Sequence, residues 1–184
     1  HMGRQSIRFP QPPVVRGFAS VAGKKEREGP LGDQFTATVQ DTTFGEKSWE
    51  RAERRMQQMT LELALEKAGL TDADLDAAFA GDLLNQCIGS SFSLRNRGVP
   101  TLGLYGACST MAESLLLAAM SVSGGYARTA LAMTSSHFAS SERQYRFPLG
   151  YGGQRTPTSQ WTVTGAGAVL LGGGECGILV TYIQ

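Results

Sequence analysis

Hydrophobic and polar positions follow two periodicities along the chain. Short apolar runs of strand length occur at 14–23, 77–84, 101–107, 126–136, 161–173 and 176–183. Two longer stretches have helical spacing. Ser48 opens the first, and Gly69 follows it as a predicted C-cap. Its apolar face holds Ala52, Met56, Met59, Leu63 and Ala64. The second, 109–123, is apolar on nearly every side, so we expect it to be buried on several sides.

Strands and helices alternate, which predicts an α/β fold with a largely parallel sheet. In such sheets ligands gather at the carboxyl ends of the strands. Three short polar or reactive clusters follow predicted strands, at 82–86, 106–108 and 134–137. We therefore expect these clusters to lie side by side.

The composition narrows the possible functions. The 184 residues suit one domain, and a net charge of +1 gives no field that would favour nucleic acid. No apolar run approaches the roughly 18–20 residues that span a bilayer, so any membrane association is expected to be peripheral. We expect no signal peptide, and His1 and Met2 are interpreted as a tag remnant.

The three cysteines, Cys87, Cys108 and Cys176, form no CxxC pair and no cysteine–histidine metal spacing. An odd number of unpaired thiols is typical of a reduced, cytosol-facing protein rather than one with disulfides. We predict no metal site and no cofactor held by the chain itself.

Cys108 is the most conspicuous chemical feature. It stands between a short apolar run and a helix, after Gly106 and Ala107, which permit a sharp turn. A thiol in the first turn of a helix meets unpaired N–H groups and the positive end of the helix dipole, and both favour the thiolate. The same N–H groups suit a bound carboxylate. Cysteine is also often a small buried packing residue, and the spacing leaves all three roles open.

The other candidates have similar alternatives. His137, the only histidine besides His1, suits a general base or a structural hydrogen bond. Asp82 suits a ligand contact or a strand-end cap, and Glu113 suits a site residue or a charge that complements the helix dipole. Arg155, framed by glycines and a proline, is the arginine best placed to bind a carboxylate.

Several segments together resemble the stage V sporulation protein AD family, itself similar to thiolases and ketoacyl synthases. The segments are GDLLNQ, GLYGACSTMAESL, TSSHFASSERQYRFPLGYGGQRTP and SQWTVTGAGAVLL. The resemblance covers nearly all of residues 4–184. It implies a thiolase-like fold of two similar halves, of which residues 3–184 form the N-terminal half, with a mixed, mostly parallel five-stranded sheet. We expect the C-terminal half to be absent from this chain.

In related enzymes the cysteine at the position of Cys108 is acylated, and its catalytic partners come from the other half. The resemblance therefore implies that this chain alone performs no condensation. His137 corresponds to a wall of the pocket rather than to the catalytic histidine.

The resemblance also implies a function in sporulation. Its members are expected to bind dipicolinic acid (pyridine-2,6-dicarboxylate) for uptake into the forespore, with or without calcium. The expected setting is the spore inner membrane, beside other stage V sporulation membrane proteins. The ligand-binding residues implied on this chain are Asp82, Asn85, Gln86, Cys108, Met111, Ser136, His137 and Arg155.

Two other hypotheses remain open at this point. One is an acyltransferase, similar to a ketoacyl synthase, that uses Cys108 and acyl-CoA. The other is an assembly subunit, because a half-fold exposes the surface that faces its partner half, which leaves a homodimer open.

Overall fold

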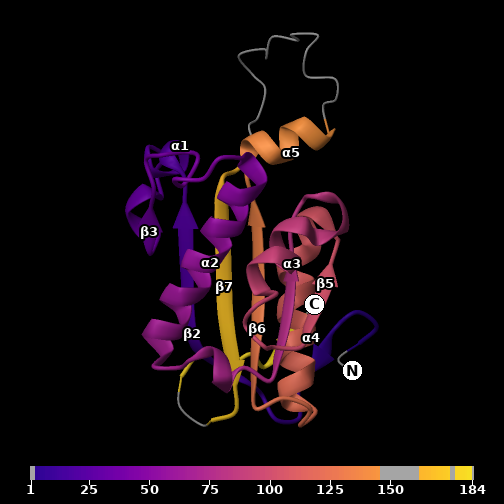
Figure 1. Ribbon diagram of the computed structural model, residues 1–184. Coiled ribbons are helices and arrows are strands. Elements are labelled where there is room, and N and C mark those ends of the chain that lie inside the picture. Colours follow the sequence, from indigo (N-terminus) through magenta and orange to yellow (C-terminus); the bar gives the residue numbers. More distant parts are fainter. Residues whose placement is uncertain (1–2, 146–161, 175–176, 184) are drawn as a thin grey trace.

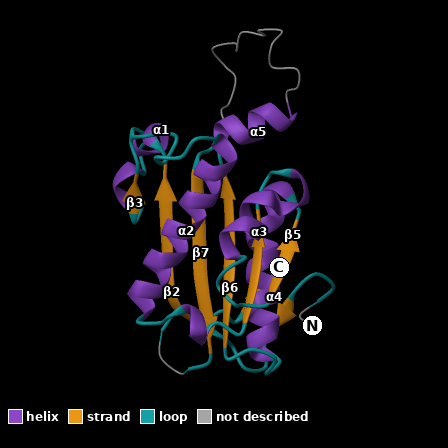
Figure 2. Cartoon of the chain, viewed as in Figure 1, coloured by secondary structure: helices purple, strands orange, loops and turns teal. Residues whose placement is uncertain are grey.

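A computed structural model of the chain describes residues 3–145, 162–174 and 177–183 (Figures 1 and 2). Its centre is a six-stranded sheet in the order β3–β2–β7–β6–β4–β5. The strands are β2 (Val14–Ala22), β3 (Ala37–Thr38), β4 (Ala77–Gly81), β5 (Thr101–Leu104), β6 (Thr129–Ser136) and β7 (Gly165–Gly172). Among these strands, β7 alone runs antiparallel to its neighbours, β2 and β6. The predicted α/β fold with a mixed, mostly parallel sheet is confirmed.

The strand count differs from the prediction of five. The sixth strand, β3, is only two residues long and pairs in parallel with the end of β2. It escaped prediction because so short a segment shows no period-2 pattern. The described part of the strand expected at 176–183 forms no full strand of this sheet and meets it through an isolated bridge between Leu179 and Val14 of β2. Its end, β8 (Tyr182–Ile183), pairs antiparallel with β1 (Ile7–Arg8) in a separate two-stranded ladder.

Five α-helices connect the strands of the described part. They are α1 (Lys24–Arg27), α2 (Trp49–Ala68), α3 (Ile88–Leu94), α4 (Thr110–Ser123) and α5 (Phe138–Tyr145). Short 3-10 turns lie at Gly32–Gln34, Asp72–Asp74, Asn85–Cys87 and Ala107–Ser109. In the chain, α1 follows β2 and α5 follows β6.

The first predicted helix corresponds to α2, and its ends follow from local chemistry. The Ser48 hydroxyl accepts a hydrogen bond from the Arg51 N–H at 3.3 Å, as expected of an N-cap. Gly69 ends the helix with φ of 64°, a left-handed conformation that glycine adopts without steric cost. The predicted apolar face is right in part, because Met59 and Leu63 are only half-buried.

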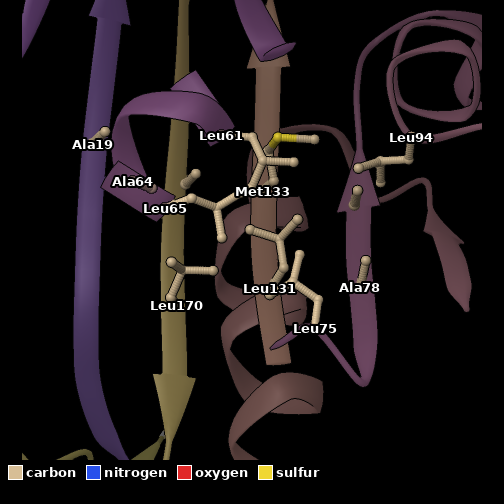
Figure 3. Close-up of a cluster of buried hydrophobic side chains, with 12 residues drawn as sticks. Ala19, Leu61, Ala64, Leu65, Leu75, Ala78, Leu94, Leu131, Met133 and Leu170 are labelled. Atoms are coloured by element: carbon tan, nitrogen blue, oxygen red, sulfur yellow. The ribbon is translucent and has the colours of Figure 1, made fainter. Parts of the chain in front are cut away.

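The two faces of the sheet carry separate apolar clusters. On the α2 face, Leu61 and Leu65 pack against Leu131, Met133 and other buried side chains (Figure 3). On the opposite face α4 covers Phe79 and the alternate alanines of β6. Burial of these side chains is the main favourable contribution to the free energy of folding. It also fixes the register of each strand, because a shift by one residue would turn every apolar side chain to the opposite face of the sheet.

The expectation that the 109–123 helix is buried on several sides is wrong for this chain. In α4 only Thr110, Ser114, Ala118 and Ala119 are buried. Leu115, Leu116 and Leu117 are half-buried, and Met120 is exposed. The physical reason is that α4 packs against the sheet with one face only.

The carboxyl ends of β4, β5 and β6 lie at one edge of the sheet, at the top in Figure 1. The chain turns there into the 3-10 turns at 85–87 and 107–109, and into α5. This edge holds all three polar clusters predicted from the sequence.

Candidate functional site

A pocket of about 450 Å³ lies at the carboxyl edge of the sheet. Each predicted cluster contributes to its lining: Asp82 follows β4, Cys108 follows β5, and Ser136 ends β6. Thr110 and Met111 of α4 and a short segment around Val163 complete much of the wall. The expectation that the three clusters lie side by side is confirmed. The volume falls within the range of about 300–1,000 Å³ typical of small-molecule sites.

Cys108 is exposed in the 3-10 turn just before the N-terminus of α4, because the chain turns sharply there. Ala107 has φ of 50°, a left-handed conformation that costs free energy for a residue with a Cβ. Gly106 packs so closely against the Glu113 carboxylate that a Cβ there would lie 2.2 Å from Oε1. Glu113 also accepts a hydrogen bond from the Ser109 hydroxyl. The turn thus presents the thiol outward on a strained backbone.

The backbone amides around Cys108 are less free than the sequence suggested. The Ser109 N–H donates to the Gly106 carbonyl at 3.1 Å, and the Thr110 N–H donates to the Ala107 carbonyl. These bonds close the 3-10 turn. A carboxylate bound here therefore depends more on side-chain donors than on a ring of open N–H groups.

Hydroxyls supply most of the polar atoms of the pocket wall. The Thr134 hydroxyl lies 3.5 Å from the Met111 sulfur, and the Ser136 hydroxyl donates to the Val163 carbonyl at 2.5 Å. Asp82 is the only charged residue among the described lining. The described wall therefore offers hydroxyls among mainly apolar surface, and it carries no positive side chain.

Asp82 is buried and its carboxylate is occupied. It accepts hydrogen bonds from the Leu84 N–H at 2.9 Å and from the Ser90 N–H and hydroxyl at 2.8 and 2.6 Å. These bonds tie the end of β4 to the first turn of α3. The geometry favours the strand-end cap interpretation of Asp82 over a direct ligand contact.

A buried polar network lies on the opposite side of the same strand ends. Glu53 of α2 is fully buried, and it accepts hydrogen bonds from the hydroxyls of Ser135 at 2.8 Å and Ser140 at 2.7 Å. Desolvation raises the pKa of Glu53 to about 7, the hydrogen bond from Ser140 opposes this rise, and the negative charge of Asp82 adds to it. Glu53 thus joins α2 to the end of β6 and to α5.

Gln57 extends this network toward α3. Its amide nitrogen donates to Ser135 at 2.7 Å and to Ser90 at 3.2 Å, while its oxygen accepts from Ser93 at 2.7 Å. Ser90 in turn contacts Asp82, so the two buried carboxylates are linked through hydroxyl and amide groups. Sequence reasoning missed Glu53 and Gln57. Their spacing of four on a predicted helix, beside Met56 on its apolar face, was the available signal.

His137 does not line the pocket. Its ring is fully buried between Trp49 and Phe138, with centroid distances of 5.5 and 5.2 Å. Nδ1 accepts from the Ala139 N–H, so Nε2 carries the proton and donates to the Thr42 carbonyl at 2.8 Å. Burial lowers the pKa of His137. Both nitrogens are engaged, which favours the structural interpretation over ligand contact or base catalysis.

Of the remaining residues predicted to bind a ligand, some line the pocket and others do not. Met111 lines the pocket, as described above. Asn85 and Gln86 are exposed in the 3-10 turn at 85–87 and do not line it. Arg155 lies outside the described residues, as does Cys176. Within the described part, no three histidine, cysteine or acidic side chains are grouped as metal ligands.

Cys87 differs from Cys108 in its exposure. It is buried, and its thiol donates to the Leu104 carbonyl at 3.1 Å. Burial raises the pKa of Cys87, with a further contribution from the Asp82 charge. Cys87 is therefore a packing residue that also fixes the end of β5.

Comparison with known proteins identifies the family. A family model of stage V sporulation protein AD matches residues 3–184. Stage V sporulation protein AD of Bacillus subtilis is 44% identical over 169 residues, which are 92% of this chain and 50% of that protein. The chain belongs to the stage V sporulation protein AD family. It spans about half the length of this curated relative.

Solved structures show that the fold of this family member is thiolase-like. The 3-oxoacyl-acyl-carrier-protein synthase III of Aquifex aeolicus aligns with a TM-score of 0.58 at 17% identity, over 89% of this chain and 55% of the enzyme. A Xanthomonas campestris OleA variant with bound lauric acid and lauroyl-CoA aligns with a TM-score of 0.57 at 15% identity, over 89% of this chain and 57% of OleA. At these identities the likeness concerns the fold alone.

The described helices include none with the length and apolar character needed to cross a bilayer.

Proposed function

We propose that this member of the stage V sporulation protein AD family binds dipicolinic acid for its uptake into the forespore, without catalysing a reaction. The observation that carries the proposal is the pocket of about 450 Å³ in which Cys108, Met111 and Ser136 meet. Membership of a sporulation family supports the biological setting. Dipicolinate is a flat dianion, and a pocket with apolar walls and several hydroxyls suits its ring and carboxylates.

The charge of the pocket sets a condition on this binding. Asp82 is the only charged residue of the described lining, and a dianion beside a carboxylate is unfavourable without a positive charge. Calcium bound by the ligand's own carboxylates would supply that charge, since calcium prefers oxygen ligands. Arg155 is the second proposed source. We therefore expect the affinity for dipicolinate to rise when calcium is present.

A calorimetric titration tests the proposal. Dipicolinate is titrated into this chain and into a version that includes the C-terminal half, with and without calcium. We expect Ser136→Ala and Cys108→Ala to weaken binding several-fold. Asn85→Ala, which changes an exposed residue outside the pocket, is the control and should bind like the wild type. Equal affinity in all variants, or binding by neither protein, would remove this pocket as the site.

The cellular setting is part of the same proposal. The protein acts peripherally at the spore inner membrane, on the cytosolic side, with other stage V sporulation membrane proteins as partners. Cross-linking in sporulating cells, followed by identification of the linked proteins, tests this. Recovery of no stage V membrane protein would contradict it.

An acyltransferase is the second candidate function, and the exposed Cys108 on its strained turn favours it. A thiol presented at a helix N-terminus is the arrangement expected of a cysteine nucleophile. Acyl-CoA is incubated with the protein that includes the C-terminal half, and the peptide with Cys108 is examined for the added acyl mass. An unmodified peptide would eliminate this function.

Self-association is a further proposal for the partners. The half-buried leucines and exposed Met120 of α4 give an apolar surface that a second copy would cover. Gel filtration with light scattering measures this directly. A strictly monomeric species over a wide concentration range would contradict it.

A further inference from the structure

A second pocket of about 450 Å³ lies between the first turns of α2 and the α3 segment, and it shares no residue with the pocket around Cys108. Figure 1 shows α2 and α3 side by side, which agrees with their extensive packing. We call it the arginine groove, after Arg51, Arg54 and Arg95, which line it.

The arginine groove carries an excess of positive charge. Its three arginines face a single acidic lining residue, Glu50, so the lining has a net charge of +2. Within the described part of the chain, neither Arg51 nor Arg95 takes part in an ion pair. An arginine guanidinium offers several donors in a planar fork that suits phosphate and carboxylate groups.

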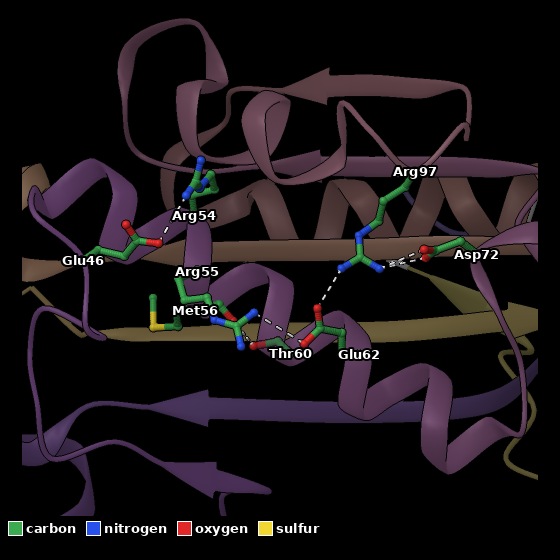
Figure 4. Close-up of polar contacts among 8 residues, drawn as sticks. All are labelled: Glu46, Arg54, Arg55, Met56, Thr60, Glu62, Asp72 and Arg97. Atoms are coloured by element: carbon green, nitrogen blue, oxygen red, sulfur yellow. Dashed lines mark hydrogen bonds and ion pairs between the residues drawn. The ribbon is translucent and has the colours of Figure 1, made fainter.

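Arg54 forms an ion pair, but one of its nitrogen donors has no described hydrogen-bond partner. One terminal nitrogen lies 3.2 Å from the Glu46 carboxylate, as Figure 4 shows. Its Nε atom, however, is buried and has no hydrogen-bond partner among the described residues. A ligand in the groove would therefore contact Arg54 through the part of its side chain that is exposed, 32% of the whole, rather than through Nε.

The wall of the arginine groove also presents flat apolar surface. The Phe92 side chain is 50% exposed, and Ile88 beside it is 42% exposed. The Arg95 guanidinium lies 5.5 Å from the centre of the Phe92 ring. An aromatic face beside a guanidinium is a suitable surface for a planar group that carries negative charge.

We propose that the arginine groove is a second binding site, for an organic anion in which a phosphate or carboxylate is joined to a flat apolar body. The anionic group contacts Arg51 and Arg54, and the body packs on Phe92 and Arg95. The site is independent of the proposed dipicolinate pocket, because the two share no lining residue.

The test uses phenyl phosphate, benzoate and inorganic phosphate as probes in calorimetric titrations of the chain. We expect phenyl phosphate or benzoate to bind at least about fivefold tighter than inorganic phosphate, because only these probes carry a ring for Phe92. Tighter binding of phenyl phosphate assigns a phosphate ligand, and tighter binding of benzoate assigns a carboxylate. Failure of both to saturate by about 10 mM, weaker than a typical functional site, would overturn the proposal.

Variants locate the binding. The double change Arg51→Gln with Arg95→Gln should weaken the affinity at least about tenfold, through loss of one charge-assisted contact and of the guanidinium that packs beside Phe92. Arg55→Gln is the matched control, because Arg55 lies on the same helix but pairs with Glu62 outside the groove. Affinities within twofold for the double variant and the wild type would overturn the proposal.

A measurement on the unmodified protein guards against misfolding of the variants. Phenyl phosphate should shift the NMR resonances of the Phe92 ring, with a saturation curve that matches the calorimetric one. Unshifted Phe92 resonances at saturation would place the ligand elsewhere and overturn the assignment.

Discussion

The end of β6 separates two regions of opposite character. Ser135 directs its hydroxyl to Glu53 and Gln57, within a network that is buried and hydrogen-bonded. Its neighbours Thr134 and Ser136 contact Met111 and Val163, on the wall of the open pocket. Successive side chains of a strand point to opposite faces, so three consecutive polar residues serve two different environments.

The polar groups on the two sides of β6 therefore differ in their partners: those on one side bond to one another, and those on the other side line a pocket. On the α2 side of β6, Glu53 and its partners form hydrogen bonds with one another. On the α4 side, Cys108 is exposed and the hydroxyls line free volume. We infer that changes on the first side act mainly on stability, whereas changes on the second act mainly on binding.

The largest expected effect is the loss of the Glu53 carboxyl. Glu53→Ala removes the acceptor of Ser135 and Ser140 and leaves a cavity. We expect the free energy of unfolding to fall by about 3 to 4 kcal/mol, measured by urea denaturation. Glu62→Ala, on an exposed part of α2, is the control and should cost less than about 1 kcal/mol. A loss below about 1 kcal/mol for Glu53→Ala would contradict the structural role of the network.

The buried carboxyl group of Glu53 should also make the stability of the fold depend on pH. The pKa of Glu53 is raised from 4.5 to about 7, so between these values the folded state holds a proton that the unfolded state has released. Stability from this group is therefore complete below pH 4.5 and is lost as the pH rises through 7, by about 3 kcal/mol in all.

Glu53→Gln should remove this pH-dependent loss, as seen by urea denaturation at several pH values. Burial lowers the pKa of His137, so protonation of the unfolded chain makes stability rise with pH below 6.5, the opposite sign. That contribution is common to both proteins and cancels in their difference. Parallel curves for the wild type and Glu53→Gln would show that Glu53 is not protonated in the folded state.

The alkylation rates of Cys108 and Cys87 compare the solvent exposure of the pocket with that of a buried site. Iodoacetamide should modify Cys108 at least about tenfold faster than Cys87, because Cys108 is exposed whereas Cys87 is buried with a raised pKa. Peptide mapping after timed quenching gives each rate separately. Equal rates would indicate that the Cys87 region opens as readily as the pocket.

The smallest expected effect on stability is on the open side. Thr134→Val keeps the shape of the side chain and removes a hydroxyl whose described contact is the Met111 sulfur at 3.5 Å. We expect a change in unfolding free energy within about 0.5 kcal/mol and a several-fold loss of dipicolinate affinity. Ser135→Ala, one residue along, should cost more stability, about 1 to 2 kcal/mol, because it removes the hydroxyl bonded to Glu53 and Gln57. Ser135 also borders the pocket, so we expect its effect on affinity to be smaller than that of Thr134→Val.

The sequence predicted the fold class and the meeting of the three strand-end clusters because these depend on patterns longer than one element. Strand ends in a parallel sheet must share an edge, so Asp82, Cys108 and Ser136 were placed together correctly. The separate pairing of β8 with β1 was not predicted, because an apolar run does not specify its partner strand.

The roles of single residues were harder to predict. His137 and Asp82 are satisfied by local backbone groups, which depends on turn geometry that residue type does not encode. Glu53 and Gln57 were missed because a charged residue on a helix is most often exposed. Their burial follows from serines brought by β6 and α5, about eighty residues further along the chain.

The position of β7 has a consequence for how the chain reaches its folded state. Among the described strands, β2 pairs with the two-residue β3 and with β7, and Val14 adds an isolated bridge to Leu179. Residues 14–22 therefore have no long described partner strand until residues 165–172 are present. The segment from β4 to β6 needs only contacts within residues 77–136. Closure of long loops slows folding, since its entropic cost precedes the reward of pairing. Within the described residues, β2 therefore precedes the other long strands in sequence but is expected to be among the last to pair in the sheet.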